Sequence, residues 1–196
     1  MVVLSDIFNM LAFRGASLEK LAFRRMFAGS VACFAIGYMI YTLVRNRVYA
    51  VLVDPVSRPP GLLRTIADLN LIQTLVFVLV IYVPTLVWIG RVIRGGGPGS
   101  SFSWQDYRAH VSALLPLWGA LFLISAPVQW MVPHFLRVGV MEISVGYLCR
   151  STLVSIYTAW AVKQLNGLTT AQAAVAFVLS WITLPLLYLL STIRLA

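Results

Sequence analysis

The sequence predicts an all-α fold, a polytopic bundle of five transmembrane helices preceded by an amphipathic surface helix. Apolar residues make up 60% of the chain and charged residues 11%, against roughly 45–50% and about 25% in soluble proteins. The mean hydropathy is +0.88. Long apolar runs of about twenty residues recur, and at about 1.5 Å per residue each can cross a bilayer core of about 30 Å. These predicted spans are Met26–Val44, Leu71–Val92, Val111–Val132, Ile143–Val162 and Ala171–Ile193.

The segment before the first run, residues 1–25, is predicted to lie on the membrane surface. Its apolar residues recur at helical spacing on either side of Gly15, which gives each half one apolar face. Arg24 and Arg25 close the segment, where headgroups would contact them. The alternative is an irregular cytoplasmic tail. The predicted division is therefore a surface segment, 1–25, and a five-span domain, 26–196.

Charge indicates an orientation and excludes one class of partner. The formal net charge is +9, but the basic residues are dispersed among the loops and form no stripe of the kind that binds nucleic acid. Four of them directly precede the first span, and such residues favour the cytoplasmic side. The N-terminus is accordingly expected in the cytoplasm. These four are Arg14, Lys20, Arg24 and Arg25.

Two loops carry clear turn signals. The run from Gly95 to Ser101 is rich in glycine, but it lacks the Gly-Lys-Ser/Thr ending of a phosphate-binding P-loop. Asn166-Gly167 predicts a tight turn that makes the last two spans an antiparallel hairpin. Thr169 or Thr170 is expected to cap the helix that follows.

Small residues and prolines predict how the helices pack. Gly29, Cys33 and Gly37 recur every four residues in the first span, a spacing that permits close helix approach. We expect this stripe to pack within the chain, with a partner protein as the alternative. Prolines interrupt three spans, since each removes a backbone donor. Kinks are predicted near Pro84, Pro127 and Pro185.

Arg150 is the one charge well inside a predicted span, with Tyr147 and Tyr157 on nearby turns. A guanidinium in lipid is costly, so it should reach the interface or find a partner. The open alternatives are a lipid phosphate, a carbonyl freed by a proline, and an acidic residue such as Asp68. Lipid or partner contacts are thus expected at Arg150, Tyr147, Tyr157, Arg24 and Arg25.

Histidine and cysteine provide no obvious catalytic or metal centre. His110 and His134 are 24 residues apart, about 36 Å along a helix, so they cannot share a ligand. Each is expected to be a solvated cap; the alternative is single ligation of a pigment or haem. Cys33 and Cys149 both fall inside spans, as small packing residues. Because no metal-binding or hydrolase motif occurs, we expect no enzyme activity.

Several segments carry a family resemblance. These are Gly95–Phe102 followed by Tyr107-Arg108-Ala109, the segment Ala113-Leu114-Leu115-Pro116, and the hairpin Trp160–Ala173. In this layout the chain resembles the bacterial Yip family of small five-span integral membrane proteins. The resemblance implies the five-span fold and a place in the bacterial inner membrane, more than it implies an activity.

Two classes of function remain open. The favoured hypothesis is a non-catalytic membrane scaffold or accessory subunit, which packs against lipid and against other integral membrane subunits of a larger assembly. The alternative is a transporter of a small molecule or ion, with a polar path near Arg150. The residues available for such a path are Arg150, Tyr147, Gln129 and Ser180.

Overall fold

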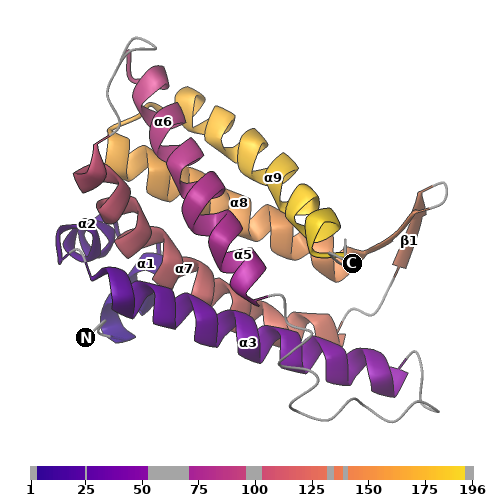
Figure 1. Cartoon of the computed structure of the whole chain (residues 1–196). Coiled ribbons are helices and arrows are strands. Elements are labelled where there is room, and N and C mark those ends of the chain that lie inside the picture. Colours follow the sequence, from indigo (N-terminus) through magenta and orange to yellow (C-terminus); the bar gives the residue numbers. More distant parts are fainter. Residues whose placement is uncertain are drawn as a thin grey trace.

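The computed structural model describes residues 4–24, 26–52, 71–95, 103–131, 135–138 and 141–192. Within these ranges the chain is helical apart from one β-hairpin (Figure 1). In chain order the elements are α1 (Leu4–Leu11), α2 (Gly15–Arg24), α3 (Phe27–Leu52), α5 (Leu71–Phe77), the π-helix η1 (Val78–Tyr82), α6 (Val83–Ile93), α7 (Trp104–Met131), β1 (Phe135–Val138), β2 (Met141–Ser144), α8 (Val145–Asn166) and α9 (Thr170–Thr192).

Three helical segments are long and apolar enough to cross a membrane: Phe27–Val44, Leu71–Ile93 and Trp104–Ala126. The stretch Thr170–Thr183 in α9 is apolar but shorter. The predicted helical class and three helices able to span a bilayer are therefore confirmed. Within its window α7 is 72% buried, against 22% for α3. That difference makes α7 the central helix, around which the others pack.

α3 and α7 run side by side and touch through their backbones (Figure 1). A Cβ atom on Gly119 would lie 2.5 Å from the carbonyl oxygen of Cys33, and one on Gly37 would overlap the carbonyl of Gly119. The Ser30 hydroxyl also donates to the carbonyl of Ser112 across this contact (3.3 Å). Two of the three small residues that the sequence singled out, Cys33 and Gly37, thus lie where α3 meets α7.

Gly29, the third small residue of the predicted stripe, lies outside that contact. Near a Cβ placed there, only the Met26 side chain comes within 4 Å, at 3.8 Å. The buried face of α3 follows the helical spacing Ser30, Phe34, Gly37 and Tyr41. Gly29 is one position away from this face, so its small size is not needed for the approach of α7.

Aromatic rings pack together between α3, η1 and α7. Phe34 packs against Trp118 and Phe122, with ring centroids 6.4 and 5.8 Å away. Tyr82 stacks on Trp118, with ring centroids 5.2 Å apart. Hydroxyl groups tie the same layer to the last two helices. The Trp118 indole donates to Thr158 (2.8 Å), and Tyr82 donates to Ser180 (2.8 Å).

Only one of the predicted kink sites shows an irregular helix. The chain forms the five-residue π-helix η1 directly before Pro84. α7 remains helical through Pro127, and α9 remains helical through Pro185. Both helices continue past these prolines, and the kinks there stay predictions. In a packed helix a proline removes one donor without necessarily ending the helix.

The α8–α9 hairpin follows the predicted turn. Gly167 takes a positive φ of 61°, and the Leu168 amide donates to the Lys163 carbonyl (3.0 Å), which is a Schellman ending. Thr169 then caps α9. Its Oγ1 accepts from the Gln172 amide (3.3 Å), while its own amide donates to Gln172 Oε1 (2.9 Å). This reciprocal capping box shows that Thr169, one of the two predicted capping residues, caps α9.

The sequence did not predict the β-hairpin. β1 and β2 pair antiparallel with Phe135 opposite Ser144 and Val138 opposite Met141. The sequence predicts that the fourth span starts at Ile143. In the structure Ile143 belongs to β2, and α8 begins at Val145. The prediction started this helix too early, because an apolar run is equally compatible with a short strand.

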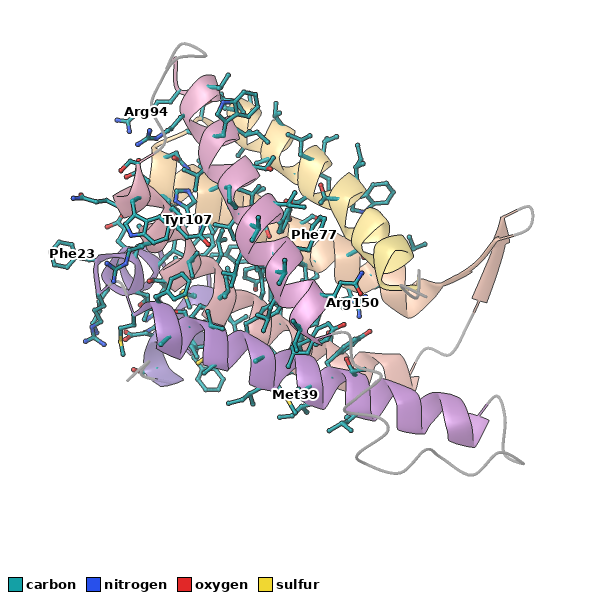
Figure 2. The ribbon with its side chains drawn as sticks, viewed as in Figure 1. Phe23, Met39, Phe77, Arg94, Tyr107 and Arg150 are labelled. Carbon is teal, nitrogen blue, oxygen red and sulfur yellow. The ribbon has the colours of Figure 1, made fainter. Side chains whose placement is uncertain are left out.

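The N-terminal helices pack against the bundle. Four apolar side chains are buried beneath them, although the sequence assigned this face to the membrane surface. Asp6, whose side chain is 4% exposed, joins the two helices through Lys20 (3.1 Å) and Arg24 (3.7 Å). Phe23, by contrast, is 85% exposed and points away from the bundle (Figure 2). The four buried residues are Met10, Leu18, Leu21 and Ala22.

Candidate functional site

The end of α6, the start of α7 and the end of α8 meet around a pocket of about 220 Å³. Hydrogen bonds between helices gather at this end of the bundle, joining Arg91 to Asp106, His110 to Asn166 and Gln172 to Ile93. The pocket wall is made of charged and polar side chains and of two apolar ones. The lining residues are Arg91, Arg94, Asp106, Ala109, His110, Leu165 and Asn166.

An ion pair closes one side of the pocket. The Arg91 guanidinium contacts Asp106 Oδ2 through Nε, at 3.0 Å, and through Nη2. The Asp106 amide in turn donates to the Ser103 hydroxyl (3.4 Å), a cap at the start of α7. A carboxylate in the first turn of a helix is favoured by the helix dipole. The pair therefore fixes the end of α6 to the start of α7.

His110 forms the floor of the pocket and is 2% exposed. Its Nδ1 lies 2.8 Å from the Asp106 carbonyl oxygen, which can only accept. Its Nε2 lies 3.0 Å from the amide nitrogen of Asn166, which can only donate. We therefore assign the neutral tautomer with the proton on Nδ1. The interfacial, solvated histidine that the sequence predicted is instead a buried link between α7 and α8.

Both ring nitrogens of His110 are thus occupied by protein groups. Ligation of a haem or pigment through Nε2 would require loss of the Asn166 hydrogen bond. Among the described residues, no group of three His, Cys, Asp or Glu side chains is placed to hold a metal ion. His134, the other predicted single ligand, lies outside the described residues.

The Asn166 side chain contacts α6, α7 and its own helix, α8. Its amide nitrogen also donates to the Val162 carbonyl (2.9 Å). The backbone of α6 comes so close that a Cβ on Gly90 would lie 2.6 Å from that nitrogen. A glycine is therefore needed at position 90 for α6 to approach the end of α8. This links the Asn166 side chain to both α6 and α7.

α9 is joined to the same end of the bundle. The Gln172 side chain donates to the Ile93 carbonyl at the end of α6 (2.9 Å). This hydrogen bond satisfies one of the carbonyls that a helix end leaves without an intrahelical partner. Lys163 donates to the Thr170 hydroxyl (2.9 Å) across the hairpin turn. Four helices, α6 to α9, are thus connected by polar contacts at one end.

Arg150 lies away from this pocket, toward the opposite end of the bundle from Arg94 (Figure 2). Its guanidinium carbon lies 4.5 Å from the centroid of the Tyr41 ring and 5.7 Å from that of Phe122. These are cation–π distances. Asp68, the acid suggested as its partner, lies outside the described residues. The predicted buried charge therefore packs on aromatic faces of α3 and α7.

The other expected contact residues do not gather around Arg150. Tyr157 faces the N-terminal helices, where its hydroxyl donates to the Leu11 carbonyl (2.6 Å) and its ring stacks on Phe13 at 4.4 Å. Arg24 lies beside Asp6. Tyr147 falls in the first turn of α8, and Arg25 lies outside the described residues. The predicted set is divided among separate parts of the molecule.

Sequence reasoning missed the groups that build the pocket. Asn166 stood out only as a turn residue, and Gly90 was hidden inside an apolar run. One signal was available. Arg91 and Asp106 flank the glycine-rich segment, so a tight connection would bring opposite charges at two helix ends together.

Comparison of the chain with protein-family models, with curated proteins and with solved structures gives no match in any of the three.

Proposed function

We propose that this chain is a non-catalytic integral membrane protein of the Yip type, which acts as a scaffold or accessory subunit of a larger membrane assembly. The bilayer would hold five spans, with α8 and α9 added to the three long apolar helices. Their 22 and 23 residues correspond to about 33 Å and about 35 Å of helix, enough to cross. The N-terminus would face the cytoplasm of a bacterial inner membrane.

The observation that carries this proposal is the division between the inside and the outside of the bundle. Many polar groups between the helices bind one another, as in the pairs Asn166–His110, Trp118–Thr158 and Tyr82–Ser180. Large apolar side chains cover the outside. A bundle of this kind supports packing by its outer surface more readily than chemistry in its interior.

We call these outer side chains the apolar belt; each is at least 40% exposed. Lipid or a partner helix would cover the belt, since water would not tolerate so large an apolar surface. The belt residues are Ile36, Ile40, Ile72, Val76, Val80, Ile81, Trp88, Val175, Val178, Trp181 and Ile182.

The test is purification from native membranes in a mild detergent, followed by sizing and mass spectrometry of the same sample. A scaffold or accessory subunit should elute with a partner protein in fixed stoichiometry. A solitary chain, recovered under conditions that keep other membrane complexes intact, would contradict the proposal.

A transporter is the second candidate, and one observation favours it. The hydroxyls of Tyr41, whose ring lies under Arg150, and of Ser151, the next residue in the sequence, are buried and make no hydrogen bond with any described group. Buried hydroxyls beside a cation are typical of a polar path. Uptake of a solute into liposomes that is lost in Arg150→Leu and kept in Arg14→Leu, which changes an exposed arginine outside the pocket, would support transport. Liposomes without solute-dependent uptake would leave the scaffold as the better account.

A further inference from the structure

The pocket between α6, α7 and α8 carries more positive than negative charge. Two guanidinium groups, those of Arg91 and Arg94, line it together with a single carboxylate, that of Asp106. His110 is neutral in the tautomer that its partners require. The lining groups thus sum to one positive charge. An anion is the complementary ligand.

The two arginines differ in how they are held. Arg91 is oriented by Asp106, so its guanidinium plane is fixed before any ligand arrives. Arg94 lies one residue after α6, is exposed, and makes no ion pair within the described residues. Figure 2 shows it at the tip of α6. One guanidinium is therefore ordered in advance, and the other is available to close over a ligand.

The size and place of the pocket select the kind of anion. Its volume of about 220 Å³ is several times the ~30 Å³ share of a water molecule, so it can accept a tetrahedral phosphate group. Arginine is the side chain that best matches phosphate oxygens, through paired N–H donors. The span Leu71–Ile93 ends just before Arg94, at the depth where phospholipid headgroups lie if this helix crosses the bilayer.

We propose that this pocket binds a phosphate group, with Arg94 and Arg91 as donors and the His110–Asn166 pair as its rigid floor. The phosphate belongs to an anionic lipid headgroup or to a soluble phosphate compound, which share this chemistry. The lipid source rests on the membrane placement of the proposed function. Failure to capture a partner protein would leave the binding prediction unchanged, so the two proposals fail separately.

The experiment measures binding to the purified full-length chain with three probes: phosphatidylglycerol, diacylglycerol and inorganic phosphate. Native mass spectrometry counts retained lipid, and titration calorimetry in lipid-free micelles follows inorganic phosphate. Diacylglycerol lacks the phosphate and serves as the probe control. Arg14→Gln is the matched variant, since Arg14 is an exposed arginine outside the pocket.

We expect Arg94→Gln to weaken binding about threefold to tenfold, the effect of one partly exposed charge-assisted contact. Arg14→Gln should bind like the natural chain. Retention of phosphatidylglycerol over diacylglycerol identifies the lipid source, and binding of inorganic phosphate alone identifies the soluble one. A natural chain that binds neither phosphate probe, or Arg94→Gln binding with unchanged affinity, would overturn the proposal.

A second variant changes the charge in the opposite direction. Asp106→Asn removes the one negative charge of the pocket, while the Asn side-chain oxygen can still accept a hydrogen bond from Arg91 and keep it oriented. Because the charge that repels phosphate is lost, phosphate binding should become tighter by about threefold or more. Its thermal unfolding midpoint shows whether the fold is kept. If Asp106→Asn is folded and binds the phosphate probes more weakly than the natural chain, the pocket is not an anion site.

Discussion

The hydroxyl of Tyr107 donates a hydrogen bond to the backbone carbonyl of Leu79, at 2.9 Å. This contact replaces a backbone hydrogen bond that Pro84 cannot make. In η1 the Val83 amide donates to the Val78 carbonyl, five residues back. The Leu79 carbonyl would next accept from residue 84, but proline has no N–H. Tyr107, from the start of α7, supplies the missing donor.

Tyr107→Phe should therefore destabilise the protein by about 1–2 kcal/mol, the cost of leaving a partly buried carbonyl without a donor. In a Pro84→Ala background residue 84 regains its N–H, and the same substitution should cost much less. Thermal unfolding in detergent of the two single variants and the double variant measures this coupling. Additive effects would mean that the tyrosine does not compensate for the proline.

The second prediction concerns the close contact between α3 and α7 at Gly37. Gly37→Ala would force a methyl group into the Gly119 carbonyl and should cost about 1–3 kcal/mol of stability. Gly29→Ala is the matched control, because a methyl group there would meet only the Met26 side chain, at an ordinary contact distance of 3.8 Å, and alanine is the better helix former. We expect Gly29→Ala to unfold at or above the temperature of the natural chain. Equal loss in both variants would contradict the packing described here.

The buried pair His110–Asn166 should behave as one unit. His110→Ala leaves one N–H of the Asn166 amide without an acceptor, and Asn166→Ala leaves Nε2 of His110 without a donor. A double-mutant cycle on thermal stability should give a coupling free energy of roughly 0.5–3 kcal/mol. The double variant should thus be more stable than the sum of the two single losses indicates. No coupling would show that the two groups do not meet in the folded protein.

The Tyr41 ring, which packs against Arg150, should contribute to the stability of the protein, and the Tyr41 hydroxyl should not. Tyr41→Phe keeps the face under the guanidinium and removes a buried hydroxyl that has no described partner, so its stability should match or exceed that of the natural chain. Tyr41→Leu should lose about 0.5–2 kcal/mol. A circular dichroism melt compares them. A larger loss in Tyr41→Phe than in Tyr41→Leu would assign the role to the hydroxyl.

The sequence predicted the helices well because their signals are local. An apolar run is read from one continuous stretch of sequence, and so is the Asn166-Gly167 turn. The structure contains long helices and this turn. The pocket depended on contacts between residues distant in sequence. His110 and Asn166 are 56 positions apart, and no spacing rule connects residues on different helices.

The same distinction explains the errors. The spacing of Gly29, Cys33 and Gly37 is symmetrical in sequence, but only a partner helix decides which face is used, and α7 uses the one with Gly37. Tyr157 is on the same helix as Arg150, but its hydroxyl donates to the Leu11 carbonyl of the N-terminal helices. The sequence singled out Arg150 because it is a charged residue inside an apolar run. The aromatic rings that it contacts belong to two other helices, α3 and α7.

The most direct test of a scaffold role is photo-crosslinking in native membranes. A crosslinking residue would replace each member of the apolar belt in turn, from Ile72 and Val80 to Trp88 and Ile182. Leu121, which is 1% exposed, is the buried control. The account predicts a discrete adduct with one partner protein from a contiguous subset of belt positions, and none from Leu121. Crosslinks to lipid alone from every belt position would contradict it.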